Sequence, residues 1–201
     1  MLIIFFQILF LVATYFIAAI PFGLLLTKVF AKKDIRQFGS KNIGATNVAR
    51  VAGKKLGLAT LLLDGLKGAL MLILARYLFV NSNHLHLFLV LVGVTAVLAH
   101  IYPVYLDFKG GKGVATSIAV LFALDPLVGF LTILSWIIVF AFSRISSLSS
   151  LVSSFCAIPL SWFLDAPISQ IIFCLFLFGL ITYRHKENIS RLLKGEEKKF
   201  K

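Results

Sequence analysis

The feature that most constrains this chain is a series of seven apolar stretches separated by short polar segments. The hydrocarbon core of a bilayer is about 30 Å thick, and a helix needs roughly 20 apolar residues to cross it. Hydrophobic residues make up 60% of the chain and charged residues only 14%, whereas soluble domains average about 45–50% and about 25%. We therefore predict an all-α polytopic membrane protein, a compact bundle of seven transmembrane helices. The stretches are Met1 to about Phe30, Leu56–Val80, Leu85–Tyr102, about Val114–Leu124, Leu127–Phe142, about Leu148–Leu164 and about Ile168–Tyr183.

The fourth stretch is shorter than the others, so a re-entrant segment is the alternative to a span there. The distribution of basic residues favours a span. With the carboxyl end inside, eighteen of the twenty Lys and Arg residues lie at inner positions, and only Lys67 and Arg76 remain, both within the second stretch. Because positive residues accumulate on the cytoplasmic side, we predict seven spans in a single domain (residues 1–201), with the amino end outside and the carboxyl end cytosolic.

The net charge of +12 thus has a topological explanation. Basic residues at the cytosolic face also attract anionic lipid headgroups, by about 1 kcal/mol per residue near the surface, so we expect membrane lipids and no nucleic acid as partners. Cys156 and Cys174 lie in apolar stretches without neighbouring ligand residues, and the four His residues lack zinc spacing. We expect no metal and no cofactor.

Two inner loops have an unusual composition. Residues 39–50 read Gly-Ser-Lys-Asn-Ile-Gly-Ala-Thr-Asn-Val-Ala-Arg, and residues 108–116 read Phe-Lys-Gly-Gly-Lys-Gly-Val-Ala-Thr. Three glycines within four residues allow the second loop to turn its N–H groups toward an anion, and the start of the following helix favours phosphate. With two lysines, this loop predicts a phosphate site; the alternative is a tight turn with interfacial lysines.

Other polar residues interrupt the apolar stretches or follow them. Asp64 and Lys67 are three residues apart and share a helix face, so we predict an ion pair that locks helices together. His100, close to the second glycine loop, is as suited to packing or capping as to binding. His185 and Asn188 would share a face if the last helix continued through them, and His185 would then point toward whatever the glycine loops hold.

Taken together, these segments resemble one family. They are similar to the acyl-phosphate:glycerol-3-phosphate acyltransferases of bacteria over nearly the whole chain, and the two glycine loops are the most specific parts. The resemblance implies a compact seven-helix bundle in the bacterial plasma (inner) membrane with its active site on the cytosolic face, in agreement with the charge distribution. The segments that carry it are Ser40–Asn47, Asp64–Gly68, His100–Val104, Lys109–Thr116 and Arg184–Asn188.

The resemblance also implies residue roles. Ser40 and Arg50 match positions that bind glycerol-3-phosphate, and Lys109 matches the lysine that holds the substrate phosphate. Ser147 matches a serine of the fifth inner loop, with Ser146 as the alternative register. The implied catalytic residues are Lys109, Arg50, His185 and Asn188, and the implied substrate-binding residues are Ser40, Thr46, Asn47, Gly110, Gly111, Lys112, Gly113 and Ser147.

The implied reaction suits these residue types. Acyl phosphate is a mixed anhydride with an activated carbonyl, so positioning and charge stabilisation are the main requirements. The resemblance implies acyl transfer from acyl phosphate to glycerol-3-phosphate, which gives 1-acylglycerol-3-phosphate (lysophosphatidate) and phosphate, the first step of phospholipid synthesis. The acyl-phosphate group itself would take the hydroxyl proton.

Two other function classes account for part of the sequence. A transporter of phosphorylated metabolites would use a similar cationic pocket in broken helices, but it predicts inverted repeats and basic groups reachable from both sides. A purely structural membrane scaffold leaves the glycine-rich loops unexplained. An acyltransferase is the interpretation that accounts for the most residues.

Overall fold

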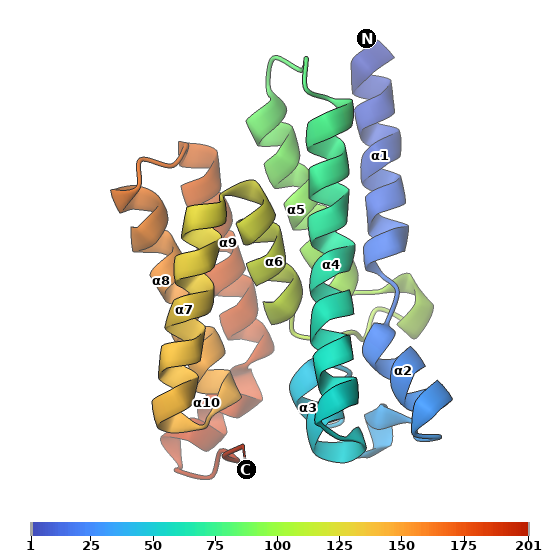
Figure 1. Cartoon of the computed structure of the whole chain (residues 1–201), viewed down its shortest axis with the longest axis vertical. Coiled ribbons are helices and arrows are strands. Elements are labelled where there is room, and N and C mark those ends of the chain that lie inside the picture. The colour runs from blue at the N-terminus through green and yellow to red at the C-terminus, as the bar shows by residue number, and fades with distance from the viewer. Residues whose placement is uncertain (1, 201) are drawn as a thin grey trace. The chain divides into compact units, whose positions relative to one another are not determined.

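The structure is a computed structural model that describes residues 2–200, and its regular elements are helices (Figure 1). Contacts divide the chain into two compact units, Met1–Val120 and Leu121–Lys201. The first unit contains α1 (Leu2–Ala18), α2 (Phe22–Phe30), the 3₁₀ turn η1 (Ile35–Gln37), α3 (Ala45–Ala52), α4 (Lys54–Leu78), α5 (Leu85–Ile101), the 3₁₀ turn η2 (Val104–Leu106) and most of α6 (Val114–Leu124). The second unit contains the end of α6, then α7 (Pro126–Ser143), α8 (Ser146–Phe163), α9 (Ile168–Arg184) and α10 (Lys186–Leu193).

The helix lengths agree with most of the predicted spans. Within residues 2–200, five segments are long and apolar enough to cross a membrane, and there is a sixth if α9 and α10, which are bent by 67° at their junction, count as one span. α6 has only 11 residues and therefore rises about 16 Å, about half the thickness of the hydrocarbon core. Each of the seven predicted stretches contains a helix, whereas the count of seven spans, the sides of the two ends and the single domain stay predictions. The five segments are Leu2–Phe30, Lys54–Leu78, Leu85–Leu106, Pro126–Ser143 and Ser146–Phe163.

The first apolar stretch is interrupted rather than continuous. α1 ends at Ala18 and α2 begins at Phe22, because Pro21 has no N–H to donate to the preceding turn. The carbonyl of Ile20 therefore leaves the helical pattern, accepting instead from the Phe22 N–H at 3.1 Å and from Lys67 Nζ at 2.8 Å. The break places a backbone acceptor where a charged side chain of α4 reaches it.

Side chains from distant parts of the sequence build the core of the first unit. In Figure 1, α4 runs beside α1 and α5, and these helices pack on one another. The rings of Phe10, Phe79 and Phe88 form edge-to-face contacts with centroids 4.8–6.2 Å apart, a favoured geometry for aromatic pairs. The Tyr15 hydroxyl donates to the Tyr102 carbonyl at 2.7 Å, which joins α1 to the end of α5.

A separate apolar cluster lies under the loop that precedes α3. Leu24, Ile35, Ile43 and Val48 are all buried together. Small residues bring the segments close: a Cβ on Gly57 would meet the backbone of α3 at Ala49. This packing fixes α3 against the start of α4, so the loop carrying Ser40 is built on a rigid base.

In the second unit, α7, α8 and α9 pack side by side. The Asp125 side chain caps α7 by accepting from the N–H groups of Leu127 and Val128, each at 3.1 Å, and its other oxygen accepts from the buried Gln170 amide at 3.0 Å. The buried serines of α8 donate mostly to carbonyls of their own helix, as Ser149 does to Ile145 and Ser150 to Ser146. These serine hydroxyls are thus satisfied within their own helix, as membrane burial favours.

The topology yields a first prediction. In a background lacking Cys156 and Cys174, Asn83→Cys and Lys199→Cys should label from opposite sides of intact cells with a membrane-impermeant maleimide. We expect Asn83→Cys to react and Lys199→Cys to react only after permeabilisation, since Lys and Arg accumulate on the cytoplasmic side. Both positions are exposed in the structure, so unequal labelling reports sidedness rather than burial. Equal labelling of both positions in intact cells would contradict the seven-span topology.

Candidate functional site

The loop that carries Ser40 is organised by one buried amide. Asn47, in the first turns of α3, is only 2% exposed. Its Oδ1 accepts from the Ser40 N–H at 2.9 Å, and its Nδ2 donates to the carbonyls of Phe38 at 3.0 Å and Asn42 at 2.8 Å. Gly39 has a φ of +61° and no room for a Cβ beside the Asn47 carboxamide. The amide therefore holds the backbone of residues 38–42 and presents Ser40 on the surface.

The remaining predicted residues of this segment lie on the short helix α3. Thr46 is half-buried, whereas the Arg50 side chain is exposed in the last turn. Ser40 is also exposed. The structure thus brings Ser40 and Asn47 into direct contact and places Arg50 one turn further along the same helix.

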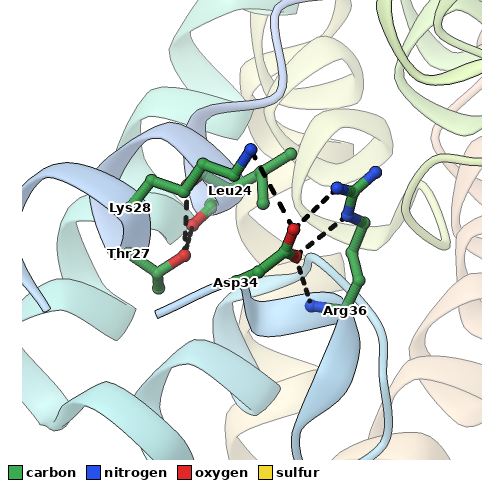
Figure 2. A network of polar contacts seen from close by, with 6 residues as sticks. Leu24, Thr27, Lys28, Asp34 and Arg36 are labelled. Atoms are coloured by element: carbon green, nitrogen blue, oxygen red, sulfur yellow. Dashed lines mark hydrogen bonds and ion pairs between the residues drawn. The ribbon is translucent and has the colours of Figure 1, made fainter. Parts of the chain in front are cut away.

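A charged network lies beside this loop, between α2 and η1 (Figure 2). Asp34 Oδ1 accepts from Arg36 Nε at 2.9 Å and from the Arg36 N–H at 3.1 Å, and Oδ2 accepts from the guanidinium at 2.6 Å. Lys28 Nζ lies 3.9 Å from the same Oδ2. The side-chain hydrogen bond from Arg36 is the main reason that the pKa of Asp34 falls from 3.8 to about 2. The network keeps Asp34 ionised and fixes the turn that follows α2.

The glycine loop is packed on the end of α5. The N–H of Gly110 donates to the Ile101 carbonyl at 3.0 Å, and the N–H of Gly111 donates to the His100 carbonyl at 3.2 Å. The last carbonyls of a helix have no intrahelical donor, and the loop supplies these two. The sequence pattern predicted that the loop would turn its N–H groups toward an anion; for Gly110 and Gly111 the structure directs them to these carbonyls instead.

Close approach is the reason for glycine at these two positions. A Cβ on Gly110 would meet the His100 carbonyl and the Pro103 ring, and a Cβ on Gly111 would meet the imidazole of His100. Gly113, which directly precedes α6, has a φ of +86°, a conformation that side chains disfavour. The sequence therefore needs glycine here for packing and for the turn into α6.

Cationic side chains extend from this packed loop. The Lys109 side chain is exposed and Lys112 is half-buried, while the N-terminus of α6 follows immediately. The turn before Lys109 holds Asp107 and Phe108 at φ values of +49° and +60°, which hydrogen bonds from Phe108 to Pro103 and from Lys109 to Leu106 maintain. Two cations and a helix N-terminus on a fixed backbone suit an anion.

The predicted ion pair of α4 is confirmed and is almost fully buried. Lys67 Nζ lies 3.0 Å from Asp64 Oδ1, and the two side chains are 3% and 2% exposed. Lys67 also donates to the Ile20 carbonyl at the break between α1 and α2. The Asp64 carbonyl accepts from the Thr116 hydroxyl at 2.7 Å, and His100 Nδ1 lies 3.7 Å from Asp64 Oδ1. One helix turn of α4 is thereby connected to the break between α1 and α2, to α5 and to α6.

The second unit contains its own polar cluster. The Ser147 hydroxyl and the Asn188 amide both donate to Glu197 Oε1, at 2.8 and 2.6 Å. Arg191 Nε donates to Glu197 Oε2 at 2.6 Å. Ser147 rather than its neighbour Ser146 makes this contact. Two residues predicted to contact substrate, 41 positions apart in the sequence, are thus brought together by a third that was not predicted.

Glu197 lies in the basic carboxyl tail, where its sequence context resembles that of the exposed Glu196. Its side chain is only 8% exposed. Burial acts to raise the pKa of Glu197, but the hydrogen bonds from Asn188, Arg191 and Ser147 outweigh it and lower the pKa below the ordinary value. The tail is further fixed by Phe200, whose N–H donates to the Arg144 carbonyl at 2.7 Å and whose ring contacts Phe140.

His185 occupies the bend between α9 and α10. The helix does not continue through it, so the condition under which His185 and Asn188 would share one helix face is not met. The ring is 3% exposed, and Nδ1 lies 2.8 Å from the Ile181 carbonyl. Because a carbonyl only accepts, Nδ1 carries the proton, which fixes the tautomer of a neutral ring.

Long apolar helices joined by loops rich in glycine, amides and cations define this chain as a polytopic integral membrane protein with polar clusters at its helix ends. Comparison with known proteins specifies the family. A model of the family described as glycerol-3-phosphate acyltransferase matches residues 8–195. The glycerol-3-phosphate acyltransferase of Pelagibacter ubique is 44% identical over 189 residues, covering 94% of this chain and 95% of that protein. The one from Myxococcus xanthus is 46% identical over 186 residues, covering 92% and 95%.

Solved structures give the same result. A crystal structure of PlsY (YgiH), an integral membrane glycerol 3-phosphate acyltransferase, in its glycerol 3-phosphate form matches with a TM-score of 0.90 and 37% identity, covering 97% of this chain and 96% of that one. Its lysophosphatidic acid form matches with a TM-score of 0.87 and 36% identity. The chain belongs to the glycerol-3-phosphate acyltransferase family, whose members are integral membrane acyltransferases of phospholipid synthesis.

The Glu197 cluster yields a second prediction. Glu197→Gln removes the charge from three hydrogen bonds, so the free energy of unfolding should fall by about 1.5–3 kcal/mol, the contribution of one charge-assisted bond. Since the pKa of Glu197 is lowered in the folded state, its contribution is present above pH about 4.5, the ordinary carboxyl value, and is lost as pH falls below that value. Thermal unfolding of the detergent-solubilised protein between pH 3 and 7 measures both effects.

Glu196→Gln is the matched control, because the structure gives Glu196 a backbone hydrogen bond to Arg191 that the substitution keeps. Its unfolding midpoint should follow that of the parent at every pH. An unfolding midpoint of Glu197→Gln equal to that of Glu196→Gln would contradict the stabilising role of the cluster.

Proposed function

We propose that this protein transfers a fatty acyl group from acyl phosphate to glycerol-3-phosphate, giving 1-acylglycerol-3-phosphate and inorganic phosphate. It would do so at the cytosolic face of the bacterial inner membrane, where acceptor and lipid product meet. The observation that carries the proposal is the fixed loop 109–113, which combines two lysines with the N-terminus of α6. A phosphate anion is what such an arrangement stabilises.

In this reaction the main contribution of the protein is to position the two substrates. The glycerol hydroxyl oxygen attacks the acyl carbonyl carbon, the bond between that carbon and the phosphate oxygen breaks, and phosphate leaves. The hydroxyl proton passes to a phosphate oxygen of the donor, so the reaction balances without a protein base. Both substrates are anionic, and Arg50, Lys109 and Lys112 would offset their repulsion.

The remaining predicted residues take supporting roles in this proposal. Ser40 and Thr46 would contact the acceptor from the loop that Asn47 organises, and Gly110, Gly111 and Gly113 would provide the backbone of the phosphate loop. In the second unit, Ser147, His185 and Asn188 would bind substrate. The cluster on Glu197 supports the last assignment, because Ser147, Asn188 and Arg191 already hold a carboxylate there and so form a set of donors suited to anions.

A transporter of phosphorylated metabolites remains the second candidate, on the ground that α1–α2 and α9–α10 are broken helices, which transporters use at their binding sites. Flux of glycerol-3-phosphate into proteoliposomes distinguishes it from the enzyme. The acyltransferase is preferred because membership of the family is established by sequence and by structure.

The donor is the subject of a third prediction. With glycerol-3-phosphate as acceptor and EDTA present, purified protein should form lysophosphatidate from a C16 acyl phosphate, and acyl-CoA or acyl carrier protein thioesters should be poor or inactive donors. A thioester offers no phosphate to the loop, and the chain lacks a His-xxxx-Asp pair for deprotonating the acceptor. Rates measured with each donor in turn decide the matter. Equal rates from acyl-CoA, or loss of activity on adding EDTA, would refute the proposal.

The cationic side chains are the subject of a fourth prediction. Lys109→Ala and Arg50→Ala should each lower kcat/KM at least ~100-fold, because each removes a charge-assisted contact of about 1.5–3 kcal/mol and disturbs alignment of the reacting groups. Lys199→Ala, an exposed cation of the tail, is the matched control and should keep parental activity. Comparable losses in all three variants would show that overall charge, and not a localised site, matters.

A further inference from the structure

The glycine loop is bounded in sequence by two residues that contact the same buried residue of α4. His100, before the loop, has its Nδ1 3.7 Å from Asp64 Oδ1. Thr116, after the loop, donates its hydroxyl to the Asp64 carbonyl at 2.7 Å. All three residues are at most 4% exposed. Asp64 thereby connects the entry and the exit of the segment 100–116.

His100 contacts the loop directly. Its carbonyl accepts from the Gly111 N–H at 3.2 Å, and its imidazole occupies the place where a Cβ on Gly111 would project. The Nδ1 side of the ring approaches Asp64, while Nε2 lies on the side that Gly111 contacts. The ring is therefore a spacer between the buried carboxylate and the backbone of the loop.

Lys67 makes this arrangement possible within an apolar helix. An uncompensated carboxylate is costly at membrane depth, and Lys67, 3.0 Å away, supplies the opposite charge. Lys67 is in turn held by the Ile20 carbonyl. The ion pair therefore holds Asp64 in a defined position, and the contacts of Asp64 with His100 and Thr116 hold these two residues in turn.

We propose that Asp64, His100 and Thr116 are positioning residues that set the place of the phosphate-binding loop, with the imidazole of His100 acting as its rigid support. The inference rests on the proposed function of loop 109–113 as a phosphate site. Displacement of a reacting group by about 1 Å can cost ~100-fold in rate, so a loop without its support loses activity while the protein remains folded.

A size exchange between Gly111 and His100 tests this proposal. Gly111→Ala should lower kcat/KM for glycerol-3-phosphate by ~100-fold, the cost of a displacement of about 1 Å, because the new Cβ meets the ring. Adding His100→Ala removes that ring, so the double variant should be at least as active as Gly111→Ala alone. The two losses are then non-additive, as expected for residues in contact.

Gly110→Ala is the matched control. Its Cβ would meet the backbone carbonyl of His100 and the Pro103 ring, which His100→Ala leaves in place, so the losses of Gly110→Ala and His100→Ala should multiply. Multiplying losses for Gly111 and His100 as well would overturn the proposed support by the ring.

The role of Asp64 and Thr116 has a separate readout. Asp64→Asn and Thr116→Val should raise the KM for glycerol-3-phosphate or for the acyl donor about tenfold, a partial version of the ~100-fold effect of a full displacement, with a smaller change in kcat. Thr95→Val, on the exposed side of α5 with its hydroxyl bonded to Leu91, should leave both constants unchanged. A merely structural role would lower kcat through loss of folded enzyme and leave KM at the parental value, and that result would overturn the inference.

Binding measurements separate this inference from the proposed function. Calorimetric titration of the detergent-solubilised parent with inorganic phosphate requires neither substrate, and Lys109→Ala reports whether the loop binds the anion. Binding that is independent of Lys109 would refute the phosphate site itself. Binding that depends on Lys109 but is unchanged in Thr116→Val and in Gly111→Ala would refute the positioning role alone.

Discussion

The ion pair between Asp64 and Lys67 is the interaction on which the first unit depends most. Removing one partner of a buried pair costs about 3–5 kcal/mol, because the other charge is left uncompensated. In this chain the two residues of the pair also make hydrogen bonds to other parts of the chain. Lys67 donates to the Ile20 carbonyl, which lies at the helix break caused by Pro21. The Asp64 carbonyl accepts from the Thr116 hydroxyl. One turn of α4 therefore contacts segments that lie about a hundred residues apart in the sequence, at Ile20 and at Thr116.

The same physical solution recurs at the polar ends of the helices. The Asn47 carboxamide forms hydrogen bonds to backbone groups of three residues of one loop. The Glu197 carboxylate accepts hydrogen bonds from Ser147, Asn188 and Arg191. In each case a buried polar group fixes the backbone around it, because leaving any of its atoms unsatisfied would be costly. Sites built in this way are preorganised, which suits a reaction that depends on alignment and charge rather than on a covalent nucleophile.

The sequence predicted a large part of this arrangement, and its failures have physical causes. The apolar stretches and the i,i+3 spacing of Asp64 and Lys67 are local patterns, and both were recovered in the structure. The hydrogen bonds from the Gly110 and Gly111 N–H groups to the last carbonyls of α5 were not predicted. Composition shows that a helix end has carbonyls without a donor, but it does not show which residues supply the donors. Whether the last helix continues through His185 was left open, because the bend of 67° between α9 and α10 coincides with no proline or glycine that would signal it.

By itself, the sequence determined that the chain is helical and embedded in a membrane, since long continuous apolar runs, with 60% hydrophobic residues overall, match membrane-spanning helices, which satisfy their own backbone groups in the bilayer. It also indicated where cations and glycines concentrate, because these are counted along the chain. Only the tertiary structure decided which buried groups meet. That Glu197 joins Ser147 to Asn188, and that the ring of His100 lies against Gly111, follows from packing between segments distant in sequence. Such contacts depend on the relative placement of whole helices, which no local pattern of residues encodes.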